Sequence, residues 1–142
     1  MIRLLKSKDI DKVMQIWMDA TMEAHPFLSA EYWEKNYTLV KDTYIPLSRT
    51  YVLEDEKEIK GFVSIIEDLF IGALFVKVDC QHQGIGGRLI NHLKKRHKKL
   101  NLAVYTENFK GVGFYKKMGF LIECEQINED SNKSEYLMSW EK

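Results

Sequence analysis

The chain has 142 residues, the length of one ordinary domain, and its hydrophobic fraction of 45% is typical of a folded globular protein. Its 21 basic and 21 acidic residues balance, so overall charge gives no support for nucleic acid as a partner. No apolar run approaches the roughly 20 residues that span a bilayer, and Cys80 and Cys124 lack a metal-ligand spacing. We therefore expect one domain over residues 1–142, without a metal, in a reducing cytoplasmic compartment.

The first part of the chain predicts a short strand followed by two helices. Ile2–Lys6 is expected to be the strand, and Ser7 is a candidate cap for a helix that stops before the first proline. Ser29 is a candidate cap for a second helix, which runs to about Val40 and ends before Pro46.

Strands and then a strand–helix alternation are predicted for the rest of the chain. A strand begins at Tyr51 and turns at Glu56–Glu58, and segments rich in Val, Ile and Phe predict two more strands. A glycine-rich loop, a helix, a strand, another helix closed by Gly119, and two antiparallel strands follow. The segments expected after the turn are Ile59–Ile66, Leu69–Val78, the helix from Ile85 to about His97, Leu102–Thr106, Phe109–Lys117, Phe120–Ile127 and Glu135–Trp140. The order β-α-α-β-β-β-α-β-α-β-β indicates an α/β (α+β) fold with one mixed sheet.

The glycine-rich loop has the composition of a phosphate-binding turn. It reads Gln81-His82-Gln83-Gly84-Ile85-Gly86-Gly87 and joins a strand to a helix, whose first turn has free N–H groups and a partial positive potential. Glycines let the backbone approach an anion closely. No Lys-Ser or Lys-Thr follows, which excludes a P-loop, and Leu89 replaces the last glycine of the dinucleotide fingerprint.

The spacing that fits is [Q/R]-x-x-G-x-[G/A], which is met by Gln81, Gly84 and Gly86. Here the chain resembles the GNAT family of N-acetyltransferases. Leu74-Phe75-Val76 is similar to the coenzyme-binding strand of that family, and Asn108–Phe120 is similar to its second signature, N-x-x-(A/G)-x-x-F-Y-x-x-x-G-F. The element order over the whole chain is also similar.

The resemblance implies a GNAT-like fold with about four helices, in which two central parallel strands splay into a V-shaped gap. It implies acetyl-CoA as co-substrate, held between Leu69–Val78 and Leu102–Thr106, and an amine as acceptor. The backbone groups of Phe75, Val76 and Val78 are expected to align the pantetheine arm of the coenzyme like an additional strand. A backbone N–H near Val76 is expected to polarise the thioester carbonyl. The expected coenzyme-binding residues are Phe75, Val76, Val78, Gln81, His82, Gln83, Gly84, Ile85, Gly86, Gly87, Arg88, Asn108 and Tyr115.

The reaction is expected to be direct attack of the amine on the thioester. By resemblance, Tyr115 is the general acid that protonates the departing thiolate, and a phenol can donate at neutral pH. The general base is open: the coenzyme-binding strand carries no acid, so the candidates are Glu67 or Asp68 just before it, and Glu23 or His25 at the end of the first helix. An unperturbed histidine, with a pKa near 6.5, suits a base at neutral pH.

The acceptor also stays open between a small molecule and an N-terminal or lysine amine of a protein, because a fold does not select among these. Two alternative functions remain. The missing strand glutamate allows a non-catalytic acyl-CoA-binding regulatory domain, and the basic run Lys94–Lys99 allows an acetyltransferase of charged tRNA. A homodimer is also compatible with the sequence.

Overall fold

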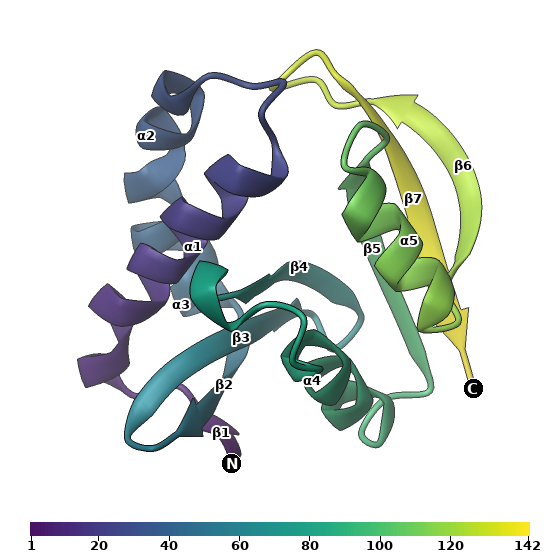
Figure 1. Cartoon of the computed structure of the whole chain (residues 1–142). Coiled ribbons are helices and arrows are strands. Elements are labelled where there is room, and N and C mark those ends of the chain that lie inside the picture. Colours follow the sequence, from purple (N-terminus) through teal and green to yellow (C-terminus); the bar gives the residue numbers. More distant parts are fainter.

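One mixed sheet of seven strands, in the order β1-β2-β3-β4-β5-β7-β6, runs through the molecule (Figure 1). The computed structural model describes all of residues 1–142. The strands are β1 Ile2–Leu4, β2 Arg49–Asp55, β3 Glu58–Ile66, β4 Phe70–Val76, β5 Lys99–Tyr105, β6 Leu121–Ile127 and β7 Ser134–Glu141. The main helices are α1 Ile10–Ala24, α2 Ala30–Leu39, α4 Ile85–Lys94 and α5 Phe109–Lys117. Short turns η1 Ser7–Asp9, η2 Val40–Tyr44, α3 Ile45–Leu47 and η3 Val78–Cys80 complete the elements.

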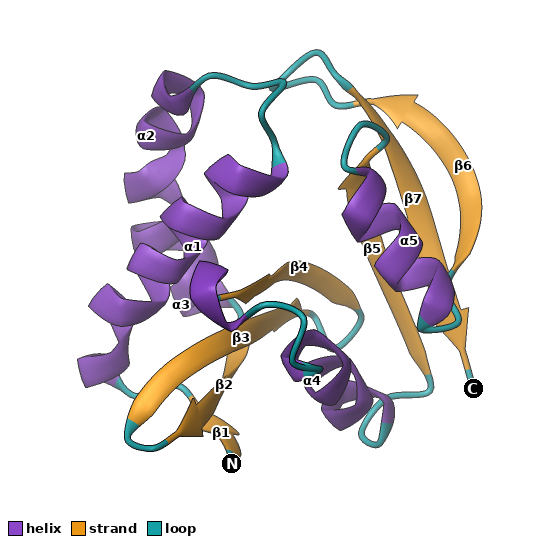
Figure 2. Cartoon of the chain, viewed as in Figure 1, coloured by secondary structure: helices purple, strands orange, loops and turns teal.

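The two central strands, β4 and β5, are parallel but stay paired only at their beginnings. Phe70 lies opposite Asn101 and Ile71 opposite Leu102, and no further pair follows. All other neighbouring strands are antiparallel. The carboxyl ends of β4 and β5 therefore diverge, which confirms the V-shaped gap expected from the sequence (Figure 2).

The sheet separates two hydrophobic cores. On one face α1 and α2 cover β2, β3 and β4, and the core there is built around Met14, Trp17 and Phe62. On the other face α4 and α5 pack against the sheet around Leu89, Leu93 and other fully buried side chains. None of the helices is both long and apolar enough to cross a membrane.

The N-terminal helices differ from the sequence prediction in two places. Ser7 does not cap α1: it begins a 3₁₀ turn, and the carboxylate of Asp9 accepts from the backbone N–H of Lys6 at 2.8 Å. Ser29 does cap α2, accepting from the N–H of Tyr32 at 3.2 Å. The helix α2 ends at Leu39, close to the predicted Val40, but the backbone stays helical beyond it. It continues through the π-helical turn η2 into α3, where Pro46 occupies the first turn and its missing N–H costs no hydrogen bond.

The central elements follow the predicted order, with shifts at their ends: α4 ends at Lys94 and not near His97, and β5 begins at Lys99 and not at Leu102. The last helix is Phe109–Lys117 as expected, and Gly119 follows it with a φ of +93°, which a left-handed helix cap requires. Strand β4 is shorter than expected. It ends at Val76, because the N–H of Cys80 bonds back to the carbonyl of Lys77 and starts a 3₁₀ turn.

Candidate active site

The edge of β4 that faces the gap offers unpaired backbone groups. The N–H of Lys77 donates to the carbonyl of Lys60 at 2.8 Å, and two positions further along this register Phe62 and Phe75 form the next hydrogen-bonded pair. Bonded and non-bonded pairs alternate along an antiparallel ladder, so Leu74 and Val76 direct their backbone groups away from β3. They point toward β5, which β4 no longer contacts as a strand beyond Ile71. An extended ligand in the gap can pair with this edge as an additional strand.

This register corrects the backbone roles expected from the sequence. The N–H of Val76 faces the gap, as its predicted role requires. The backbone N–H and carbonyl of Phe75 are instead bonded to β3. Leu74, and not Phe75, therefore has backbone groups free to align the pantetheine arm. Val78 lies beyond the strand, in the turn η3, so it does not extend the edge of β4.

The loop after β4 is held against the end of that strand. The side-chain amide of Gln81 donates to the carbonyl of Val76 at 3.4 Å. His82 and Gly84 have φ values of +65° and +80°, so the chain turns sharply twice before α4 begins. His82 and Gln83 are exposed beside this turn. Gln81 thus ties the loop to the gap edge by its side chain.

The first turn of α4 presents free N–H groups. The first hydrogen bond into the helix runs from Arg88 N–H to the carbonyl of Gly84 at 3.1 Å, and no side chain caps this end. The N–H groups of Ile85, Gly86 and Gly87 are therefore unpaired, and they lie where the helix dipole favours an anion. The side chain of Ile85 is buried in the core, so only its backbone is available to a ligand.

The glycines of the loop have different tasks. Gly84 needs its left-handed backbone, while a Cβ at Gly84 would meet nothing within 4 Å. A Cβ at Gly86 would lie 3.2 Å from Cζ of Phe114 on α5. Gly86 therefore allows α4 and α5 to pack closely, which was not anticipated from the phosphate-binding pattern.

Arg88 lies on a different side of α4 from the residues that pack on α5. It lines a cavity of about 280 Å³ together with Ile2, Asn91, His92 and Lys95. Its contact with a coenzyme phosphate stays a prediction.

The second sequence signature forms α5 and its cap. The side chain of Asn108 accepts from the N–H of Gly111 at 3.0 Å and so caps the helix. A Cβ on Gly111 would lie 2.5 Å from Asn108 Nδ2, which explains the small residue at this place in the signature. The observed role of Asn108 is thus structural, and its expected contact with the coenzyme stays a prediction.

Tyr115 is half-buried on α5, with its ring against Phe114 and Phe120 at centroid distances of 5.2 and 5.6 Å. Its hydroxyl makes no hydrogen bond within the protein. Burial raises the pKa of the phenol above its ordinary value. The group therefore keeps its proton at neutral pH and is able to donate it.

His25 is buried at the end of α1, where it is 7% exposed, and its imidazole hydrogen-bonds to a backbone carbonyl in the last turn of that helix. Nδ1 lies 2.8 Å from the carbonyl of Thr21, so Nδ1 carries the proton and donates it. The ring packs among Phe27, Trp33 and Tyr105, with centroid distances of 5.0 to 5.6 Å. Burial lowers the pKa of His25 to about 4. The unperturbed pKa near 6.5, on which its role as a base depended, is therefore wrong.

Glu67 and Asp68 form the tight turn between β3 and β4, with φ values of +55° and +56°. This turn lies at the end of the sheet where β4 and β5 are still paired, whereas His25 contacts Tyr105 at the carboxyl end of β5. Both acids are exposed, as is Glu23 on α1. The structure does not bring Glu67 and His25 to one place, so at most one of them can serve a single reacting centre.

Two tyrosines close the wide end of the gap, a feature that no sequence pattern indicated. Tyr32 donates to Asp130 at 2.5 Å, and Tyr105 donates to Ser131 at 2.9 Å. The loop between β6 and β7 is thereby fastened to α2 and to the end of β5. We call these two hydrogen bonds the loop clasp.

The basic run Lys94–Lys99 is only partly free. Lys94 donates to the carbonyl of Met118 and lies 5.0 Å above the ring of Trp140. His97 bonds to the carbonyl of Leu93. No group of three or more His, Cys, Asp or Glu side chains converges to hold a metal ion.

Comparison with known proteins identifies this architecture. The model of a family described as acetyltransferase (GNAT) domain matches residues 46–122. The peptidyl-lysine N-acetyltransferase YiaC of Escherichia coli is 33% identical over 141 residues, covering 99% of this chain and 96% of that protein. The peptidyl-lysine N-acetyltransferase YjaB of Salmonella typhimurium is 32% identical over 133 residues, covering 93% and 90%.

Solved structures show the same fold. The solution structure of apo YjaB from Escherichia coli superposes with a TM-score of 0.86 at 25% identity, covering 99% of this chain and 96% of the other. The PaiA N-acetyltransferase of Thermoplasma acidophilum, solved in complex with coenzyme A, superposes with a TM-score of 0.82 at 20% identity, covering 100% and 98%.

Proposed function

This chain belongs to the GNAT family of acetyltransferases, and from that premise we propose that it acetylates the side-chain amine of lysine in proteins or peptides. Membership makes it an acetyl-CoA-dependent N-acetyltransferase, which defines the donor and the reaction class. Lysine is supported as the acceptor by two curated relatives, each over 30% identical along more than nine-tenths of this chain, that act as peptidyl-lysine N-acetyltransferases. The whole chain, residues 1–142, acts as one domain in this proposal.

The observation that carries the proposal is the free edge of β4 beside the uncapped start of α4. In our proposal the pantetheine arm pairs with the backbone of Leu74 and Val76. The pyrophosphate oxygens accept hydrogen bonds from the backbone N–H groups of residues 85–87. The thioester then lies in the gap, where a β4 N–H polarises its carbonyl. Such donors contribute roughly 3–4 kcal/mol in well-studied acyl-transfer sites.

The chemical step is the attack of a neutral lysine amine on the thioester carbon. A C–N bond forms, the C–S bond breaks, and the departing thiolate takes a proton, which we assign to the hydroxyl of Tyr115. The amine must also lose a proton. His25 is weakly basic, Glu67 and Asp68 lie at the other end of the sheet, and Glu23 is an exposed side chain on α1, so we propose that solvent water removes this proton.

Two measurements test the proposal. Millimolar acetyl-CoA should raise the melting temperature, and the absence of any shift would overturn the coenzyme assignment. Transfer is then measured by mass spectrometry on a peptide with a blocked N-terminus and one lysine. A matched peptide with norleucine in place of lysine is the control. Acetylation of spermidine or of a free N-terminus, with none on the lysine peptide, would refute lysine as the acceptor.

A further inference from the structure

One half of the sheet has an uncovered face. Leu100, Leu102 and Val104 of β5 point into the core beneath α4 and α5, so Asn101 and Ala103 point to the opposite side. There α1 and α2 cover only the strands up to β4. The open face therefore belongs to β5, β7 and β6 (Figure 1).

This open face lies on the side from which the amine must come. The coenzyme loop leads into α4, and Tyr115 lies on α5, so the coenzyme occupies the face that carries these two helices. An attacking amine approaches the thioester through the gap from the other face. Any polypeptide that bears this amine then passes over the region between α1 and the open strands.

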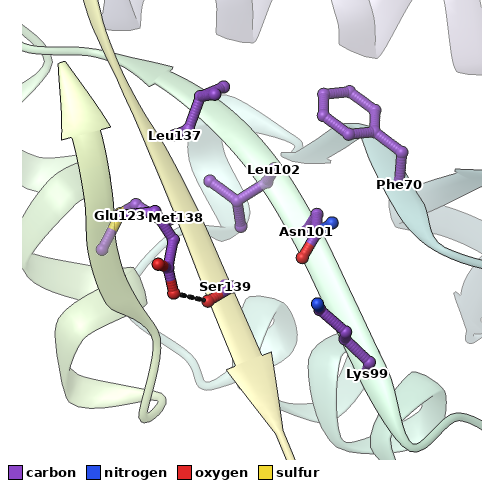
Figure 3. Close-up of a pocket in the computed structure, with 8 residues that line it drawn as sticks. All are labelled: Phe70, Lys99, Asn101, Leu102, Glu123, Leu137, Met138 and Ser139. Atoms are coloured by element: carbon purple, nitrogen blue, oxygen red, sulfur yellow. Dashed lines mark hydrogen bonds between the residues drawn. The ribbon is translucent and has the colours of Figure 1, made fainter.

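A cavity of about 310 Å³ opens on this face, next to the point where β4 and β5 are paired (Figure 3). Phe70 stands at one side of it and Leu137 at another. Asn101 and Ser139, which are paired across β5 and β7, form its floor. The lining residues are Phe70, Lys99, Asn101, Leu102, Glu123, Leu137, Met138 and Ser139.

The floor of this cavity contains an unsatisfied polar atom. The side-chain oxygen Oδ1 of Asn101 is buried and has no hydrogen-bond partner. Leaving such a group unpaired is unfavourable, because it has lost its hydrogen bonds to water and gained none in the protein. The terminal torsion of an asparagine rotates easily. The Oδ1 of Asn101 can therefore turn to accept a hydrogen bond from a donor that enters the cavity.

The rim of the cavity carries one charge of each sign. Lys99 is exposed and forms no ion pair. Glu123 is also exposed, and it accepts a hydrogen bond from the hydroxyl of Ser139 but has no cationic partner. Apolar walls, an amide on the floor and unpaired charges at the rim are complementary to an extended polypeptide with polar and charged side chains.

We propose that this cavity binds the segment of the acceptor polypeptide that flanks the lysine, with a backbone N–H of that segment donating to Asn101. The inference rests on the proposed acetylation of lysine. In the proposed site the pantetheine arm runs along β4 from the loop past Val76 toward Leu74, so the thioester lies beside Leu74. Asn101 pairs with Phe70, four residues before Leu74, so Asn101 and the thioester are about 13 Å apart along the strand. An extended peptide covers this distance in about four residues. The cavity therefore holds residues about three to five positions from the lysine.

The test compares Asn101→Leu with the wild type on two acceptors: a peptide with five residues on each side of its lysine, and the single amino acid lysine with its α-amine and carboxyl blocked. The variant should raise KM for the long peptide about five- to tenfold, the effect of one hydrogen bond, and leave KM for the single residue unchanged. Melting should not be lowered, because the substitution removes a buried unsatisfied group. Asn91→Leu, an exposed asparagine on α4, is the control and should change neither KM.

Peptide truncation and a charge reversal sharpen the result. Peptides shortened to two residues on each side should show no difference between wild type and Asn101→Leu. Glu123→Lys should shift the preference from basic toward acidic residues three to five positions from the lysine. Equal KM increases for long peptide and blocked lysine, or no increase for either, would overturn the docking site while leaving lysine acetylation intact. Failure of the wild-type enzyme to acetylate any peptide would instead refute the proposed function, and the docking site with it.

Discussion

The phenol of Tyr32 donates a hydrogen bond of 2.5 Å to the carboxylate of Asp130, joining residues 98 positions apart in the sequence. Burial and this bond both raise the pKa of Tyr32, so the phenol is protonated at neutral pH and is able to donate. With the bond from Tyr105 to Ser131, it forms the loop clasp across the wide end of the gap. The two halves of the sheet, which separate there, are thus connected by side chains.

Removing the Tyr32 hydroxyl should loosen this connection. Tyr32→Phe should lower the free energy of unfolding by about 1 kcal/mol and the melting temperature by about 3 °C, because the lost partner is an exposed carboxylate. Tyr44→Phe is the control, since the exposed Tyr44 makes no side-chain hydrogen bond. Equal losses in the two variants, measured by urea unfolding, would show that the clasp contributes nothing specific.

Tyr115→Phe should lower kcat by a factor of about 100 or more, because general acid catalysis typically contributes that much. KM for acetyl-CoA should change less than twofold, since the ring and its packing on Phe114 are retained. Steady-state kinetics with a lysine peptide measures both constants. Tyr136→Phe, on the neighbouring β7, is the matched control. Unchanged turnover in Tyr115→Phe would remove the phenol from the mechanism.

The buried His25 should make stability depend on pH. Its pKa is about 4 in the folded protein and near 6.5 when unfolded, so the unfolded chain binds the proton more tightly. Stability is then fully present above pH 6.5 and declines as the pH falls toward 4, by about 2 kcal/mol between pH 7 and pH 5. Urea unfolding of His25→Gln should show a smaller decline over this range than the wild type. The exposed His82→Gln should decline as the wild type does, and identical slopes for all three would contradict the burial argument.

Gly86→Ala should destabilise the contact between α4 and α5. The new Cβ would lie 3.2 Å from the Phe114 ring, so the ring or the helix must shift. We expect a loss of about 1–2 kcal/mol in stability and a weaker thermal shift with acetyl-CoA. Gly113→Ala is the contrasting variant: nothing lies within 4 Å of its Cβ, and alanine should stabilise α5 by about 0.5–1 kcal/mol. A stabilising Gly86→Ala would refute the close-packing role.

Local patterns were sufficient to predict the elements around the coenzyme. The bounds of α5 and the cap at Ser29 depend on neighbouring residues, and the structure reproduces them closely. The predicted strand ran two residues too far, to Val78, because its apolar composition does not reveal the backbone bond that turns the chain at Lys77. The end of α2 near Val40 was predicted, but the helical turns η2 and α3 after it were not, because a proline that follows a helix and one that begins a new helical turn have the same local sequence signal.

The properties of the site depended on contacts that the sequence does not encode locally. The low pKa of His25 arises because Phe27, Trp33 and Tyr105 surround the ring from separate elements. The role of Phe75 depended on register, since a single step along a strand exchanges the backbone groups that face the gap. Glu67 was a reasonable candidate for the general base because it is close in sequence to β4. In the structure it lies at the opposite end of the sheet from His25.

The short pairing of β4 with β5 has a consequence for the folding cooperativity of the whole protein. Only two residue pairs connect the strands on which the two halves of the sheet meet. A coenzyme that binds along β4, as we propose, would occupy the position of the missing strand pairs. The bound coenzyme would then bridge the two halves of the sheet. In the free enzyme the two half-sheets are therefore joined mainly by the core beneath α4 and α5 and by the loop clasp, with few backbone bonds between them. Amide protons on either side of the gap should exchange more slowly, and more nearly together, once acetyl-CoA is bound.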